Sequence, residues 1–427
     1  MTDKLLTPQQ VSAMAEIEGQ AEDEAVQRRA RVLLLSDQGL AAREIASQAG
    51  ISTRTVYRWR KAFVDRGLSS FPDGGRAAAP AEEEEESGPV SPEPPGPSDP
   101  LEQLAKLARK IKTPGIQPDD SMAEAGRKVL RLHFARMLYH EPGTRLGQDI
   151  EELHDMRVAT RRMRAAFEVF GDYFKKGVLK THLKGLRATG RALGPVRDLD
   201  VFLQKMQLHM EGRSEEEQAG LAPLQSSWRA QRKAARKKML GYLDIQTYKD
   251  FLQSFSQFLN TPGAGAKSLT RDFPLPHKVR DVAPILIYTR LGAVRAFDSV
   301  LENATIDQLH ALRIEFKRLR YTVEFFQEVL GPEGRAVVEE IKKVQDHLGD
   351  LNDADVACNI LGDFLSKWEK EQLALSIQQR ANPEPIVAYL ATKYAERHRL
   401  VTTFPQVWER FMRPEFHDAL AKAVSVL

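Results

Sequence analysis

The chain has 427 residues, a length at which two to four domains with cores of their own are expected. Its one cysteine, Cys358, excludes a scaffold held by internal disulfides, and we expect this residue to be buried rather than reactive. The stretch from Met1 to Leu35 has neither a signal segment nor a long apolar run. These features predict a soluble cytoplasmic protein with no membrane partner.

The formal net charge of +3 conceals two regions of opposite sign. Residues 1–100 hold 11 basic and 17 acidic side chains, which leaves 51 basic and 42 acidic side chains for residues 101–427. An excess of basic side chains as small as that of residues 101–427 is usual for a solvated surface. The placement of the bases therefore decides whether a polyanion is the partner.

Residues 42–63 have the spacing of a helix-turn-helix. Gly50 permits the tight turn, and Ile45, Val56 and Trp59 are placed to lock two helices together. Ser52 is suited to cap the second helix. Between residues 28 and 66 there are nine basic side chains and three acidic ones, as a DNA-facing surface requires. The second helix is expected to present Thr53, Arg54, Thr55 and Arg58 to DNA.

Residues 25–76 as a whole resemble the helix-turn-helix found at the start of many transposases and in homeodomain-like regulators. No acidic triad of a recombinase is evident downstream, so the resemblance does not imply transposition. The alternative is a three-helix module kept for contacts with other proteins.

Three breaks divide the chain. Residues 77–100 contain seven prolines, a run of five glutamates and no aromatic residue, which predicts a disordered, stiffened linker. Weaker breaks lie at 113–118, after a short amphipathic segment, and at 260–277. We therefore expect a helix-turn-helix domain over 1–76, a linker over 77–118 and a helical domain over 119–427, with its halves at about 119–259 and 278–427.

Both halves of the helical domain have apolar residues at spacings of three and four and no strand-like alternation, which predicts an all-α fold. A motif that begins at His154 returns at His310, an offset of 156. A second motif, Leu193-Gly194 with Asp198 and Asp200, returns 155 residues later as Leu348-Gly349 with Asp353 and Asp355. Two motifs that recur in the same order at nearly the same offset indicate duplication. We therefore expect two similar helical bundles related by a pseudo-twofold axis.

Each copy of the first motif places bases on one face of a helix and apolar residues on the other. Like charges at this spacing repel by a few tenths of a kcal/mol per pair, so the repeated arrangement needs a compensating anion. Carboxylates of the same chain, such as Glu168 and Glu324, are one source. They are too few for all the bases, which favours an extended groove for an external anion.

The HxxRVxxRRxR and LHxLRIxxKRLRYxxE segments, with LGxxRDxD and LGDLNDAD, resemble the CHAD family, the conserved-histidine α-helical domain, from about Asp119 to Leu427. The resemblance implies a pair of four-helix bundles around a basic channel that binds inorganic polyphosphate. The ligand-facing set that it implies is His154, Arg157, Arg161, Arg162, Arg164, His310, Arg313, Lys317, Arg318, Arg320 and Tyr321. Neighbouring basic stripes add Lys180, Lys184, Arg187, Arg191, Arg229, Arg232, Arg236 and Lys342.

Glu339 and Asp346 replace bases of the first copy, so we expect the two bundles to grip the ligand unequally. No HExxH, CxxC or GxxxxGK[ST] motif accompanies His154, His310 or His347, and we expect no metal and no cofactor. The paired aspartates follow glycines that we read as turns, where they would cap helices and orient arginines.

The leading hypothesis is a non-enzymatic polyphosphate-binding protein that the helix-turn-helix links to DNA, associated with polyphosphate granules or the nucleoid. One alternative is a DNA-binding transcription regulator whose helical domain serves as an effector or oligomerisation module. Another is a metal- or phosphohistidine-dependent phosphatase or phosphotransferase that uses His154 or His310.

Overall fold

The structure is a computed structural model that describes residues 6–20, 24–40, 42–49, 56, 59–60, 63, 67, 100–268 and 276–427. It consists of two compact units, Met1–Pro94 and Pro95–Leu427. No named β-strand occurs in the described residues, where only two isolated bridges are found. The predicted all-α fold is confirmed. Among the described helices, none is both long and apolar enough to cross a membrane.

The first unit contains helices α1 (Pro8–Gln20), α2 (Glu24–Asp37) and α3 (Ala42–Ala49). Helices α1 and α2 pack against each other around Met14 and Leu33, which are fully buried. A second cluster contains Ile45 and Val56, both fully buried, with Trp59 packed against them. The predicted contact among these three residues is confirmed.

The other predicted features of this unit lie outside the described residues. They are the turn at Gly50, the cap at Ser52 and the DNA-facing side chains Thr53, Arg54, Thr55 and Arg58.

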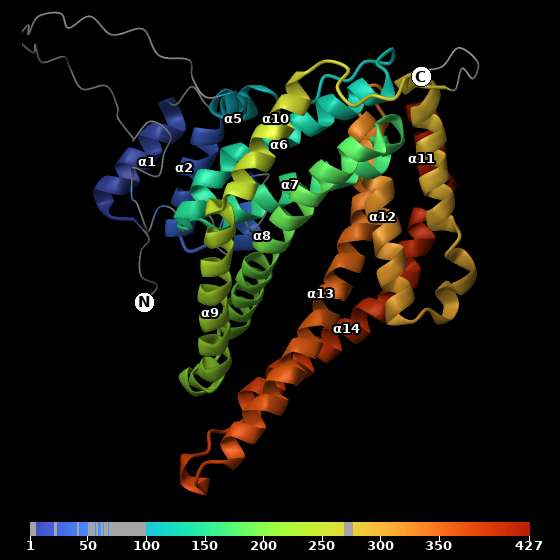
Figure 1. The fold of residues 1–427 in the computed structure, drawn as a ribbon. Coiled ribbons are helices and arrows are strands. Elements are labelled where there is room, and N and C mark those ends of the chain that lie inside the picture. Colours follow the sequence, from blue (N-terminus) through green and yellow to red (C-terminus); the bar gives the residue numbers. More distant parts are fainter. Residues whose placement is uncertain are drawn as a thin grey trace, which may run out of the picture. The chain divides into compact units, whose positions relative to one another are not determined.

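The second unit begins with α5 (Pro100–Lys110), which buries Leu104 against the main core. The first repeat contains α6 (Met122–Leu146), α7 (Ile150–Phe170), α8 (Lys176–Met210), α9 (Glu215–Asp244) and α10 (Gln246–Asn260). The second contains α11 (Val279–Arg295), α12 (Ile306–Phe326), α13 (Gly334–Leu373), α14 (Glu384–Phe411) and α15 (Pro414–Val424). Within each repeat, successive long helices pack against each other, as α13 and α14 do side by side in Figure 1.

Local capping residues set where the two basic helices begin. Asp149 precedes α7 and accepts a hydrogen bond from the backbone N–H of Glu151. Thr305 precedes α12 and forms a capping box with Gln308. Each cap satisfies backbone N–H groups that have no partner inside the helix, so both 21-residue helices start at defined positions.

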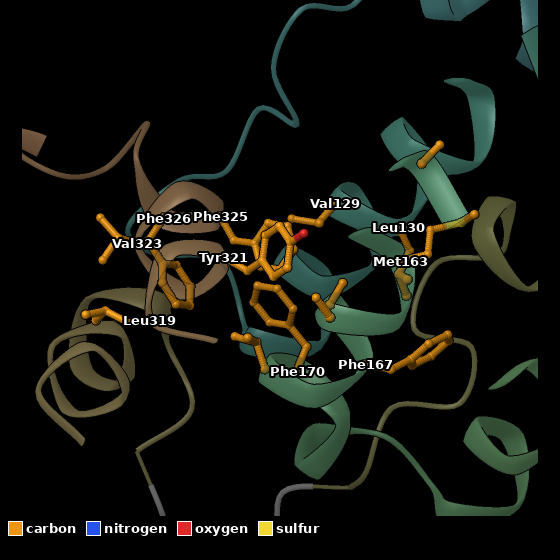
Figure 2. Packing of buried hydrophobic residues seen from close by; sticks show 14 of the residues in the cluster. Val129, Leu130, Met163, Phe167, Phe170, Leu319, Tyr321, Val323, Phe325 and Phe326 are labelled. Atoms are coloured by element: carbon orange, nitrogen blue, oxygen red, sulfur yellow. The ribbon is translucent and has the colours of Figure 1, made fainter. Parts of the chain in front are cut away.

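One continuous apolar core joins the two repeats. Phe170 at the end of α7 is fully buried, and its ring lies 5.5 Å from that of Phe326 and 6.0 Å from that of Phe325, both on α12. Figure 2 shows Phe170 pointing toward the aromatic side chains of α12. Burial of each such ring contributes about 1.5–3 kcal/mol, so this contact fixes α7 against α12.

A separate apolar cluster joins the far ends of the long helices. Met206 from α8, Trp228 from α9, Leu361 from α13 and Tyr389 from α14 are buried together there. Close approach of α9 to α14 depends on Gly220, because a Cβ atom at this position would lie 2.3 Å from Cγ of Pro385. The repeats therefore contact each other here as well as at the α7–α12 contact.

The expected turns at Gly194 and Gly349 are wrong. Both glycines lie inside uninterrupted helices, Gly194 in α8 and Gly349 in α13. The adjoining Leu193 and Leu348 are buried in the core, and this tertiary packing outweighs the weak helix propensity of glycine. The aspartates that follow are consequently mid-helix residues and do not cap helix starts.

Candidate functional site

Helices α7 and α12 each separate an apolar face from a basic one. On α7, Met156, Met163 and Phe170 are fully buried, whereas Arg157 is half-buried and Arg161 is exposed. On α12, Phe316 and Leu319 are fully buried while Arg313 and Lys317 are half-buried. The predicted division of both helices into a packing face and a basic stripe is thus present in the structure.

The two stripes converge. Loss of hydration is the largest cause that lowers the pKa of Lys317 to about 7, and the positive charges of Arg313, Arg161 and Arg157 contribute to this shift. Two of these arginines belong to α7 and one to α12. Such mutual repulsion requires the bases of both helices to be close together. We call Arg157, Arg161, Arg313 and Lys317 the basic cluster.

Most of the basic cluster lacks an acidic partner. Within the described part of the chain, the side chains of Arg161, Arg313 and Lys317 form no hydrogen bond or ion pair. Surrounding protein atoms desolvate the guanidinium groups of Arg161 and Arg313 and lower their pKa, and nearby arginines add to this effect, which the charge of Asp353 opposes at Arg313. Arg157 is the exception, since its Nη2 lies 3.2 Å from Oδ1 of Asp198. The fold therefore concentrates positive charge that it does not neutralise itself.

Ion pairs on the flanks join the two basic helices reciprocally. Nη2 of Arg162 lies 2.8 Å from Oε2 of Glu324, and Nε of Arg318 lies 3.8 Å from Oε2 of Glu168. Both members of the second pair are 156 residues from their counterparts in the first, which is the offset of the repeated motif. The intramolecular carboxylates thus bind the flanking arginines, and the basic cluster stays open to an external anion.

Arg320 and Tyr321 lie near the same flank. Nε of Arg320 is 3.2 Å from Oε1 of Glu324. The Tyr321 side chain is buried, and the guanidinium carbons of Arg162 and Arg320 lie 5.7 and 5.4 Å from the centre of its ring. These contacts fix the arginines against an aromatic face. The buried Tyr321 hydroxyl contacts no hydrogen-bond partner among the described residues.

The aspartates of the second motif bind basic side chains. Arg232 pairs with the buried Asp200, and the corresponding Asp355 accepts a hydrogen bond of 2.8 Å from Nη1 of Arg397. Asp353 accepts one of 2.8 Å from Nζ of Lys205, which joins α13 to α8. No group of three or more potential metal-ligating side chains occurs in the described residues.

The histidines of the motifs have separate environments. Nδ1 of His310 is 2.7 Å from Oδ1 of Asn352, and Nε2 of His347 is 2.8 Å from the carbonyl oxygen of Leu400. His154 is half-buried on α7, next to the basic face. Each of the first two rings is therefore held by an uncharged acceptor.

The remaining predicted ligands differ in their availability. Six of them are exposed on α7, α8 and α9, namely Arg164, Lys180, Lys184, Arg187, Arg191 and Arg229. Arg236 instead donates hydrogen bonds of 2.7 and 3.0 Å to the carbonyl oxygens of Arg145 and Leu146 at the end of α6. Lys342 pairs with Glu339 at 3.4 Å. Sequence reasoning missed Lys205 and Arg397, which lie outside the repeated motifs and meet their aspartates only in the folded chain.

This fold and this site define a class of protein: a duplicated all-α domain in which two paired helices bring their basic stripes together. Residues 128–362, more than half of the chain, match the family model of the CHAD domain, and the chain belongs to this family. Residues 23–72 match the model of a homeodomain-like domain. Both predicted resemblances are confirmed.

Two solved structures are similar to this chain. The CHAD domain from the plant Ricinus communis is 21% identical with a TM-score of 0.50, and the match covers 73% of this chain and 94% of that one. PptA from Streptomyces chartreusis is 16% identical with a TM-score of 0.48, and the match covers 68% and 100%. Comparison with curated proteins gives no match. The Ricinus communis structure supports the fold.

Proposed function

We propose that the chain binds inorganic polyphosphate at the basic cluster without catalysing a reaction on it, and that the homeodomain-like domain connects this binding to DNA. The observation that carries the proposal is the convergence of Arg161, Arg313 and Lys317, which have no acidic partner in the described part of the chain. The CHAD family resemblance supports the same ligand.

A linear polyanion fits this site better than a single phosphate ion does. The bases from His154 to Arg164 extend over about 15 Å of helix, since each residue adds about 1.5 Å. A second stripe of the same length lies on α12. Guanidinium and ammonium groups spaced along two helices contact many phosphoryl oxygens in succession. Affinity then comes from the number of contacts.

The decisive experiment replaces Arg157, Arg161, Arg313 and Lys317 with Glu in the full chain. We expect polyphosphate binding to be lost, because four attractive charges become repulsive, while helicity stays unchanged. The matched control replaces two exposed lysines outside the basic helices, Lys249 and Lys267, with Glu. Binding by the folded quadruple variant at the affinity of the original chain contradicts the proposal.

Absence of catalysis is part of the proposal and has its own test. The alternative phosphatase or phosphotransferase would need His154 or His310 as a reacting group. Incubation of the full chain with polyphosphate and Mg²⁺ should release no phosphate above the level of a His154→Gln, His310→Gln variant. Release that disappears in this variant would establish the alternative.

The DNA link is tested separately. Arg54→Ala with Arg58→Ala should weaken retention on DNA and leave polyphosphate affinity unchanged, because the homeodomain-like match ends at residue 72 and the basic cluster begins at residue 157. DNA retention equal to that of the unchanged chain would instead favour a module for protein contacts.

A further inference from the structure

A cavity of about 700 Å³ lies in the second unit, apart from the basic cluster. Its walls come from α6, from Arg162 of α7, from the end of α12 with the turn that follows it, from the start of α13 and from the segment after α5. The side chains that line it include His133 and Arg136 of α6, Arg335 of α13, and Lys112. No residue of the basic cluster contributes to the lining.

The positive charges of this cavity exceed the negative charges that remain to balance them. Two acidic residues line it, Glu324 and Glu328. Glu324 already pairs with Arg162 and Arg320. Glu328 accepts hydrogen bonds of 2.9 Å from the backbone N–H groups of Gly115 and Ile116, which anchors the segment that borders the cavity. Both carboxylates are thus committed to other groups.

The basic side chains of the cavity are less committed. Nη2 of Arg136 donates one hydrogen bond of 2.9 Å, to the carbonyl oxygen of Lys112. The side chains of Lys112 and Arg335 have no acidic partner among the described residues and are exposed. Three cations from three separate segments therefore surround one space. This arrangement suits a tetrahedral phosphate better than a planar carboxylate, which a single guanidinium binds in bidentate fashion.

A buried histidine forms part of the cavity wall. His133 is 3% exposed, and its Nδ1 has no hydrogen-bond partner among the described residues. Burial, with the charges of Arg162 and Arg136, holds its pKa well below the usual value, so the ring is neutral. Its Nδ1 has less than 1 Å² of accessible surface, so the ring contributes a neutral face to the wall and this nitrogen does not contact a molecule in the cavity.

The rest of the lining is apolar, with Leu132, Phe325 and Leu330 beside Pro114 and Pro332. The volume is far larger than a phosphate ion needs and falls in the range of sites for small organic ligands. We propose that this cavity binds a phosphomonoester the size of a mononucleotide, with the phosphate held by Arg136, Arg335 and Lys112. The organic part then packs against the apolar wall and the neutral ring of His133.

The test is equilibrium dialysis of the full chain against AMP, GMP, CMP and UMP, each at up to about 1 mM. At least one should bind, and Arg136→Gln and Arg335→Gln should each weaken that binding about tenfold, since each removes one charge-assisted contact. Arg131→Gln is the matched control, because Arg131 is an exposed arginine of the same helix that does not line the cavity. Arg335 is exposed, so its substitution leaves the fold intact even if that of Arg136 does not.

Three results would overturn the proposal. They are no binding of any of the four nucleotides, equal affinity for inorganic phosphate alone, and binding that neither Gln substitution weakens. The quadruple Glu variant of the basic cluster separates this site from the polyphosphate site. Nucleotide binding should persist in that variant, and its loss there would assign the nucleotide to the basic cluster instead.

Discussion

Lys317 shows at the residue scale what the convergence of two basic helices does to a single group. Its amine has an ordinary pKa of 10.5, which falls to about 7 through burial and four neighbouring arginines. The unfolded chain therefore binds more protons than the folded chain between pH 7 and 10.5. Because of this difference, the unliganded fold gains stability from this group as the pH rises through that range.

Polyphosphate binding should reverse this shift, because a bound anion favours the charged amine. The affinity should therefore fall as the pH rises above 7, by up to about tenfold per pH unit. Titrations at pH 7.5, 8.25 and 9 measure this slope above the range in which histidines change charge. Lys317→Arg should flatten the response, since a guanidinium keeps its proton. An equally steep slope in this variant would mean that another group takes up the proton.

The sequence was sufficient to place the bases on their helices but not to find their partners. Helical spacing separates Arg157 and Arg161 from the buried Met156 and Met163 without any tertiary knowledge. The pairing of Arg232 with Asp200 depends on how α9 packs on α8, which local spacing does not encode. Arg236 was predicted to face the ligand, yet it donates a hydrogen bond to a carbonyl oxygen of α6. This contact also depends on tertiary packing, which local spacing does not encode.

At the scale of elements, the two reciprocal ion pairs between α7 and α12 differ in their surroundings. The side chains of Arg162 and Glu324 are 25% and 14% exposed, and those of Arg318 and Glu168 are 41% and 54% exposed. Water screens the second pair more strongly. In double-mutant cycles followed by denaturant unfolding, we expect a coupling of about 1 kcal/mol or more for Arg162–Glu324. For Arg318–Glu168 we expect less than about 0.5 kcal/mol. Equal couplings would contradict this difference.

Two glycines inside the long helices should respond to alanine in opposite directions. A Cβ atom at Gly349 of α13 would meet nothing within 4 Å, so Gly349→Ala should stabilise the fold by about 0.5–1 kcal/mol through helix propensity. A Cβ atom at Gly185 of α8 would lie 2.2 Å from the Phe251 ring, so Gly185→Ala should destabilise it by about 1–3 kcal/mol. Chemical denaturation measures both changes. The same sign for both would show that propensity or packing has been misjudged.

The helices themselves were predictable from apolar periodicity, and their continuity was not. Gly194-Pro195 and Gly349 have the composition of turns, but α8 and α13 continue through them because the residues on either side are buried. A local rule gives the cost of a glycine in a helix. It does not give the larger contribution of the core on which the helix packs.

For the whole molecule, duplication was evident from two motifs repeated at offsets of 156 and 155 residues. The repeat predicts two similar bundles and cannot predict how they join. That information lies in dispersed residues, such as Phe170 beside Phe326 and Trp228 near Tyr389, which share no recognisable motif. The repeats of the folded molecule are joined at both of these places, and the bases of α7 and α12 come together as a result.

The salt dependence of polyphosphate binding tests the central claim most directly. Each phosphate that a base neutralises should add about 0.7 to the slope of log K against log salt, by analogy with single-stranded nucleic acids. We predict a steep decrease for the full chain. For the variant with Arg157, Arg161, Arg313 and Lys317 replaced by Gln, the slope should be smaller by about 3, with helicity unchanged. The same slope in the folded variant and the original chain would contradict the account, because it would place the phosphate contacts elsewhere.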